Sequence, residues 1–90
     1  MIALSIVIAA YNEAERLPKT LLALGEYLKN LKLAHEIIVV DDGSVDNTFQ
    51  IVKNLSRDYP EIKIVRHSPN RGRGFSVREG VLQAQGQFIL

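Results

Sequence analysis

The sequence predicts an α/β domain built on a small parallel sheet. Four short apolar segments of the strand type alternate with three segments whose apolar residues recur at helical spacing. Strands joined by helical crossovers pair in parallel, with right-handed connections. The resulting β-α-β-α-β-α-β order uses the whole chain of 90 residues, so a single small domain accounts for it.

The expected strands differ in composition. Residues 4–9 and 36–40 are nearly continuous aliphatic and β-branched runs, typical of strands covered on both faces. Residues 62–66 alternate apolar and polar side chains, so we expect this strand nearer a sheet edge. Residues 87–90 indicate the opening of a fourth strand. Natural domains seldom end on a bare apolar strand, so we expect the chain to be a truncated domain.

Two helices are predicted between the first three strands. The first is indicated by leucines at alternating steps of four and three, which form one face of an amphipathic helix: Leu17, Leu21, Leu24, Leu28 and Leu31. Pro18 fits its first turn. The second helix has Ser44 or Asp46 as its candidate N-cap. We expect it to end at Tyr59-Pro60 and to bury Phe49, Val52 and Leu55.

A third helix is predicted over residues 75–85, with Val77 and Val81 facing inward and Gly86 ending it. The expected strand order is 3-2-1-4. This order reverses between strands 1 and 4, and ligands bind at such switch points, beyond the carboxyl ends of the strands. The predicted site therefore includes residues 10–13 and 41–44, together with whatever follows residue 90.

Composition excludes several classes of protein. The apolar fraction of 47% and the charged fraction of 23% are those of a soluble globular protein, which excludes disorder. A net charge of +1 argues against a nucleic-acid binder that works by bulk charge. The absence of cysteine excludes disulfides and Cys-ligated zinc. No apolar run approaches the roughly 18 residues that suggest a membrane span.

The turn after the first strand carries three candidate binding residues. Tyr11 could stack on a nucleobase, an interaction worth roughly 1–3 kcal/mol. Asn12 could fix the turn, and Glu13 could accept a hydrogen bond from a base. The same triplet also fits an ordinary strand-to-helix turn, in which Glu13 favours the helix dipole.

Two adjacent carboxylates, Asp41 and Asp42, follow the second strand. They repel each other unless a base N–H, a ribose hydroxyl or a metal ion compensates. Adjacent residues of an extended chain point in opposite directions, so we expect Asp42 to face a ligand and Asp41 to brace the loop. The alternative is an Asp-Gly turn followed by a helix cap at Ser44.

The segment Asn-Arg-Gly-Arg-Gly at residues 70–74 leads into the third helix. Gly72 would let backbone N–H groups approach an anion, which the helix N-terminus also favours. Arg71 and Arg73 could engage a diphosphate, and Arg78 could point the same way from the next turn. Alone, the segment also fits a solvated basic loop.

Two histidines, His35 and His67, have no neighbours at ligand spacing, so we expect them to be surface or strand-edge residues.

Together, in this order and spacing, these segments resemble glycosyltransferase family 2, the inverting enzymes of GT-A type. The resemblance is carried by residues 5–13, 36–48, 70–80 and 84–90. The basic glycine loop is most similar to the polyprenyl (dolichyl or undecaprenyl) phosphate sugar transferases, which use UDP-glucose or GDP-mannose. The resemblance implies the Rossmann-like first part of a nucleotide-diphospho-sugar transferase fold. Ala9 stands where the family commonly has proline. The alanine can loosen the turn but does not remove a contact group.

The resemblance also implies what the site binds. The expected donor is a nucleotide sugar, with the nucleotide bound by Ala10, Tyr11, Glu13, Asp41, Asp42 and Ser44. The expected phosphate-binding residues are Arg71, Gly72, Arg73 and Arg78. A divalent metal, Mn²⁺ or Mg²⁺, is expected in the full-length parent on an Asp-x-Asp motif after Leu90. No catalytic base is expected in this chain, which should be inactive alone.

The implied acceptor is a polyprenyl phosphate, which implies a cytoplasmic protein working at the cytoplasmic membrane face. Two alternatives remain. An NAD-type Rossmann oxidoreductase shares the topology, but residues 9–12 lack the glycines that its pyrophosphate requires. A non-catalytic module would only bind nucleotide or would self-associate through an open strand edge at residues 88–90.

Overall fold

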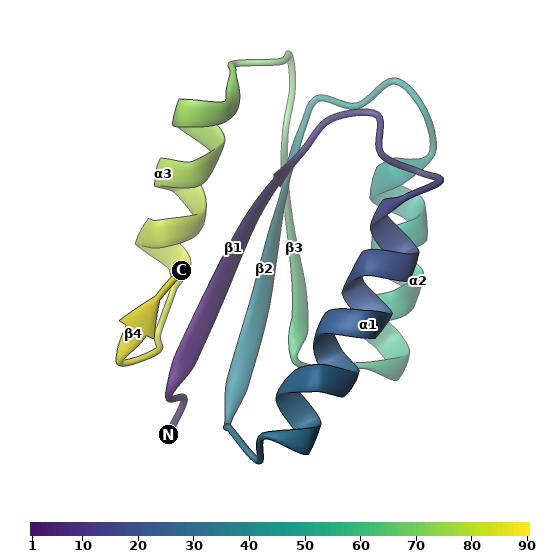
Figure 1. The fold of residues 1–90 in the computed structure, drawn as a ribbon. Helices are drawn as coiled ribbons and strands as arrows, with labels where there is room; N and C mark the ends of the chain where they lie inside the picture. The colour runs from purple at the N-terminus through teal and green to yellow at the C-terminus, as the bar shows by residue number, and fades with distance from the viewer.

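The computed structural model describes all 90 residues and shows strands and helices in strict alternation (Figure 1). The elements are β1 (Leu4–Ala10), α1 (Leu17–Asn30), β2 (His35–Asp42), α2 (Thr48–Asp58), β3 (Ile62–His67), α3 (Arg73–Gln83) and β4 (Phe88–Ile89). The strands form one parallel sheet in the order β3-β2-β1-β4. The predicted fold class and strand order are confirmed, and β3 lies at an edge as expected.

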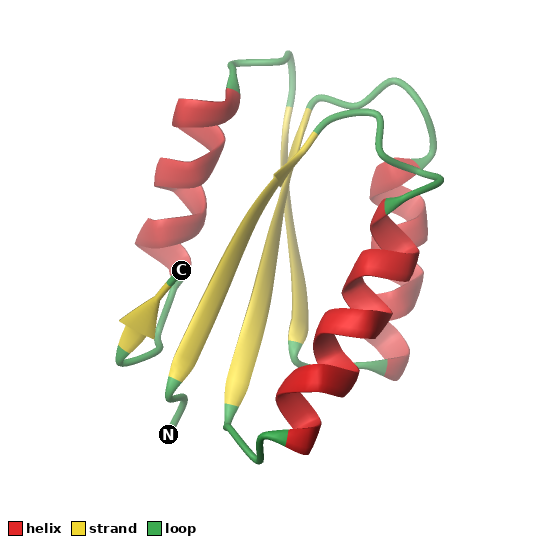
Figure 2. Cartoon of the chain, in the orientation of Figure 1, coloured by secondary structure: helices red, strands yellow, loops and turns green.

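Helices cover both faces of the sheet: α1 and α2 lie on one side and α3 lies on the other (Figure 2). Strand β2 is the most deeply buried element, because it has a strand on each side and helices on both faces. The main hydrophobic cluster lies between the sheet and the α1–α2 layer and contains Ala10, Leu17, Leu21, Leu28, Ile37, Val39, Val52 and Ile62. Ala10 and Leu17 of this cluster pack the carboxyl end of β1 against the start of α1.

The first two helices follow their predicted patterns with two corrections. Pro18 lies in the first turn of α1, but Leu31 follows the end of the helix and is half-exposed, so it does not belong to the buried face. Helix α2 ends before Tyr59 as predicted. At its start, the Asp46 carboxylate accepts the Thr48 N–H at 2.9 Å. Asn47 is the N-cap residue, so neither Ser44 nor Asp46 holds that position, although Asp46 satisfies the first backbone donor of the helix.

Helix α3 packs differently from the prediction. Val77 and Val81 were expected to face inward, but they are 38% and 40% exposed, while Ser76 and Gly80 are buried. A Cβ atom on Gly80 would lie only 2.3 Å from Cγ1 of Val7. The helix therefore approaches the sheet through its small residues, which apolar periodicity cannot reveal. It also begins and ends two residues earlier than predicted.

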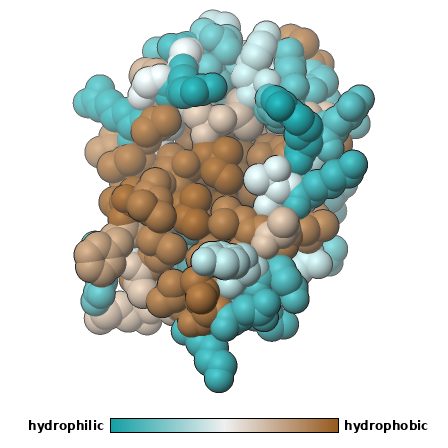
Figure 3. Space-filling view, viewed as in Figure 1, coloured by the Kyte–Doolittle hydropathy of each residue, from teal (hydrophilic) through white to brown (hydrophobic).

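The edge of the sheet beyond β1 is incompletely covered. Strand β4 pairs with Leu4 and Ser5 of β1, and the Val7 N–H donates to the Leu90 carbonyl at 2.9 Å, so β1 has no strand on that side beyond Val7. Figure 3 shows a broad apolar surface on this side of the molecule. The exposed large apolar residues of α3 and the chain end are Val77, Val81, Leu82, Phe88, Ile89 and Leu90. Self-association through this edge stays a prediction.

A buried carboxylate ties the amino ends of the strands together. Glu36 accepts hydrogen bonds from the Ser5 hydroxyl at 2.6 Å, from Lys63 Nζ at 2.6 Å and from the Gln85 N–H at 2.7 Å. These donors come from β1, from β3 and from the turn before β4. Burial by itself would raise the pKa of the Glu36 carboxyl, but the hydrogen bonds, led by that from Lys63, outweigh burial and lower the pKa below its ordinary 4.5.

We expect Glu36→Gln to lower the free energy of unfolding by about 1–3 kcal/mol, because buried donors lose a charged acceptor. Because folding lowers the pKa, the stability that Glu36 contributes is complete above pH 4.5 and is lost as pH falls through the folded value. Urea denaturation at pH 7 and pH 3 should therefore show a smaller difference for Glu36→Gln than for the unmodified chain. The exposed Glu26→Gln serves as the control, and an equal acid dependence in all three proteins would contradict the prediction.

Candidate functional site

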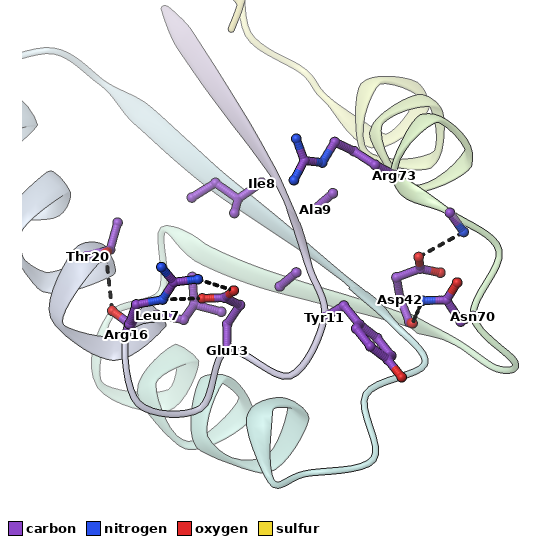
Figure 4. Close-up of a pocket in the computed structure, with 12 residues that line it drawn as sticks. Ile8, Ala9, Tyr11, Glu13, Arg16, Leu17, Thr20, Asp42, Asn70 and Arg73 are labelled. Atoms are coloured by element: carbon purple, nitrogen blue, oxygen red, sulfur yellow. Dashed lines mark hydrogen bonds and ion pairs between the residues drawn. The ribbon is translucent and has the colours of Figure 1, made fainter.

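A cavity of about 550 Å³ lies beyond the carboxyl ends of β1 and β2, at the predicted switch point. Figure 4 shows its two walls on either side of β1. One wall is the end of β1 and the start of α1, with Ile8, Ala9, Ala10, Tyr11, Glu13, Arg16, Leu17 and Thr20. The other wall is formed by Asp42, Asn70, Gly72 and Arg73. The cavity therefore combines an apolar floor, an open tyrosine and polar groups from both walls.

The turn after β1 is fixed by the segment that leads into α2. Asn12 has a positive φ of 53°, and its side-chain oxygen accepts the Val45 N–H at 2.9 Å. The Asn12 N–H donates to the Ser44 hydroxyl and the Glu13 N–H donates to the Thr48 hydroxyl, both at 2.9 Å. Asn12 thus fixes the turn as predicted, and Tyr11 is left 45% exposed at the cavity mouth.

Glu13 has a partner that the sequence analysis missed. Its two carboxylate oxygens lie 2.9 Å from Nε and 2.5 Å from a terminal nitrogen of Arg16. This hydrogen-bonded pairing raises the pKa of the exposed Arg16 guanidinium. The spacing Glu-x-x-Arg just before a predicted helix was the signal that could have revealed it. Arg16 adds a second cation to the cavity, although its pairing with Glu13 leaves the wall nearly neutral.

Asp42 binds the basic loop. Its Oδ1 accepts the Arg71 N–H at 2.7 Å and its Oδ2 accepts the Gly72 N–H at 2.9 Å. The side-chain amide of Asn70 donates to the Asp42 carbonyl at 3.1 Å. The carboxylate is 4% exposed and lies on the cavity wall. The N–H groups of the loop therefore compensate the negative charge of Asp42, for which the sequence suggested a ligand or a metal ion.

Gly43 allows the loop to lie this close to β2. Its φ is +70°, and a Cβ atom at this position would lie 2.7 Å from the backbone nitrogen of Asn70. Any side chain would be strained in this conformation and would also push the loop away.

Asp41 points away from the cavity, as alternation along the strand predicts. Its Oδ1 accepts a short hydrogen bond from the Ser44 hydroxyl, and its Oδ2 lies 3.5 Å from Nε of Arg66. The carboxylate is fully buried. Asp41 therefore braces the turn as expected. Neither Asp41 nor Ser44 lines the cavity, although both were predicted to bind nucleotide.

The structure separates the three predicted phosphate-binding arginines. Arg73, the first residue of α3, lines the cavity together with Gly72. The Arg71 guanidinium instead lies over the Phe75 ring, 5.0 Å from its centre, and does not line the cavity. Arg78 also lies outside the cavity lining. Of the three cations, only Arg73 is placed where it can meet a ligand that occupies this cavity.

The family model described as "Glycosyl transferase family 2" matches residues 5–90 of this sequence. The chain belongs to glycosyltransferase family 2. This membership sets aside the alternative of an NAD-type oxidoreductase. A dolichyl-phosphate beta-glucosyltransferase of Trichomonas vaginalis is 38% identical over 97% of the chain. The chain spans 28% of the length of that relative.

Two solved structures share the fold. The Staphylococcus aureus protein TarS, residues 1–349 in complex with UDP, matches with a TM-score of 0.84 and 29% identity. That match covers 99% of this chain and 26% of TarS 1–349. The mannosyltransferase PcManGT from Pyrobaculum calidifontis, solved with GDP-Man and Mn²⁺, matches with a TM-score of 0.82 and 23% identity, over 96% of this chain and 25% of its own. The chain therefore shares the GT-A fold of these proteins and corresponds to about a quarter of their length.

The residues of this family 2 chain do not themselves fit a divalent metal. No three His, Cys, Asp or Glu residues are grouped so that they could hold an ion. The Asp42 oxygens each accept a backbone N–H, and one Asp41 oxygen accepts hydrogen bonds from Ser44. We therefore assign no chemical step to a metal within these residues.

None of the helices is both long and apolar enough to cross a bilayer.

Proposed function

We propose that this chain is the donor-binding part of a glycosyltransferase and that its cavity takes the nucleoside diphosphate of a nucleotide sugar. The observation that carries the proposal is the pairing of Tyr11 and Arg73 on opposite walls of one cavity at the sheet switch point. An exposed aromatic ring offers a stacking face to a base, and a cation at a helix N-terminus favours a diphosphate.

The roles follow from the position of each residue. Tyr11, directly after β1, would stack on the base, and Ala10 contributes to the apolar part of the cavity lining. Arg73 and the first turn of α3 would meet the diphosphate, where the helix dipole adds to the side-chain charge. Asp42 holds the loop that leads to Arg73 through the N–H groups of Arg71 and Gly72.

The relatives and structural neighbours support a finer proposal for the full-length protein. Dolichyl-phosphate beta-glucosyltransferase relatives favour glucose as the sugar and a polyprenyl phosphate as the acceptor. The bound UDP and GDP-Man of the structural neighbours favour a UDP- or GDP-linked donor. We further propose that the complete enzyme uses Mn²⁺ or Mg²⁺ and acts at the cytoplasmic face of a membrane.

Calorimetric titration of the chain with UDP and with GDP tests this proposal. We expect one of the two nucleotides to bind and Arg73→Ala to weaken that binding roughly tenfold, a loss of about 1.4 kcal/mol. The matched control is Arg57→Ala, which removes an arginine from the far end of α2. Equal affinities for Arg73→Ala and the unmodified chain would contradict the assignment of Arg73. A folded chain that binds neither nucleotide would contradict the proposed function.

A further inference from the structure

His67, the last residue of β3, contacts the loop that follows it and does not line the cavity. Its side chain is 16% exposed, and its ring nitrogens contact three separate segments. Nδ1 lies 3.3 Å from Oδ1 of Asp42 and 3.4 Å from the carbonyl oxygen of Pro69. Nε2 lies 3.0 Å from the hydroxyl of the fully buried Ser76 in α3. The ring therefore joins β2, the loop and α3.

These contacts favour one hydrogen-bonding arrangement of the ring. Both oxygens next to Nδ1 are acceptors, so an Nδ1–H donates to the Pro69 carbonyl and lies close to the Asp42 carboxylate. Nε2 then accepts a hydrogen bond from the Ser76 hydroxyl. The ring also packs edge-on against Phe75, with centres 5.1 Å apart and planes at 88°. His67 is thus fixed at both nitrogens and along one edge.

The fixed ring contacts both supports of the cavity wall that carries Gly72 and Arg73. Asp42 Oδ1, the atom next to His67 Nδ1, also accepts the Arg71 N–H. Ser76 and Phe75 belong to the first turn of α3, which begins at Arg73. Both supports of this wall therefore contact the histidine. The opposite wall is held by a separate set of hydrogen bonds, in which Ser44 and Thr48 accept N–H groups of the turn after β1.

We propose that His67 is a positioning residue for the diphosphate half of the nucleotide. It holds the loop and the start of α3 so that Arg73 and the helix N-terminus meet the diphosphate, while it contacts no ligand itself. This inference rests on the proposed function. It differs from that function by predicting that His67 affects only one half of the ligand, because the wall that would hold the base is built independently.

The test compares a nucleoside with its diphosphate. His67→Ala should weaken binding of the preferred nucleoside diphosphate by about three- to tenfold, the worth of one hydrogen bond, and leave binding of the corresponding nucleoside unchanged. His67→Asn, whose side-chain amide can donate to the Pro69 carbonyl from the place of Nδ1, should recover most of the loss. His35→Ala is the matched control, because it makes the same change at the opposite end of the sheet.

A second readout needs no nucleotide. Amide hydrogen exchange at Arg71 and Gly72 should accelerate in His67→Ala and stay unchanged in His35→Ala. Unchanged exchange in His67→Ala would overturn the positioning role even where nucleotide binds. Equal effects on nucleoside and diphosphate would overturn its restriction to the diphosphate. A folded chain that binds no nucleotide would instead refute the proposed function, and the exchange experiment would still decide whether His67 holds the loop.

Discussion

Asp42→Asn is expected to weaken nucleotide binding at least roughly tenfold, and to lower the free energy of unfolding by about 1–3 kcal/mol. The carboxylate accepts the N–H groups of both Arg71 and Gly72, one on each oxygen. An asparagine side chain keeps only one of these acceptors and turns an NH₂ group toward the other backbone donor. The loop should therefore detach from β2 at one point and carry Arg73 with it. Calorimetry and urea denaturation of the same sample measure both effects.

The control for Asp42→Asn is Asp58→Asn, which makes the same change at the exposed end of α2. We expect it to leave nucleotide binding unchanged. If Asp42→Asn bound nucleotide as tightly as the unmodified chain, neither direct contact nor loop positioning by Asp42 could be important. If stability fell without any loss of affinity, Asp42 would serve the fold alone, and its place in the candidate site would be wrong.

Gly80→Ala is expected to lower the free energy of unfolding by about 1–3 kcal/mol, although alanine is the better helix former. The added methyl group would lie 2.3 Å from Cγ1 of Val7 and 3.2 Å from Cγ2 of Val40. Both neighbours are β-branched and have few alternative rotamers, so the helix must move away from the sheet. Thermal and urea denaturation followed by circular dichroism measure the change.

Gly25→Ala makes the same chemical change, but we expect it to change the free energy of unfolding in the opposite direction. Gly25 lies within α1, and nothing lies within 4 Å of an added Cβ atom. Alanine there should raise the free energy of unfolding by about 0.5–1 kcal/mol through helix propensity alone. If both variants were stabilised, the close packing of α3 on the sheet would be wrong.

The fold could be predicted from the sequence because its signals are local and agree with one another. The short aliphatic and β-branched runs of β1 and β2 are typical of strands that are covered on both faces. The leucines of α1 recur at steps of three and four, which places them on one face of a helix. The inward face of α3 could not be predicted, because Ser76 and Gly80 are buried by shape and not by hydrophobicity. Their burial depends on how closely a helix can approach Val7, which is a property of the assembled sheet.

The candidate site was predicted in part for the same reason. The positions of Tyr11, Asp42 and Arg73 follow from strand ends and a loop that are visible in the sequence. The separation of Arg73 from Arg71 depends on the direction of side chains within that loop, which sequence spacing does not determine. His67 was predicted to be a surface or strand-edge residue because it has no partner nearby in the sequence. Its contacts with Asp42 and Ser76 exist only after β3, β2 and α3 come together.

The central claim is that the cavity beyond β1 and β2 binds the nucleoside diphosphate. Backbone amide chemical shifts of the isotope-labelled chain, recorded as UDP or GDP is added, test this most directly. We expect the shifts to change at residues 10–13 and 70–75, on the two walls of the cavity, and to stay constant at the opposite end of the sheet, around Glu36 and Glu61. Changes confined to that opposite end, or no change in a folded chain with either nucleotide, would contradict the account.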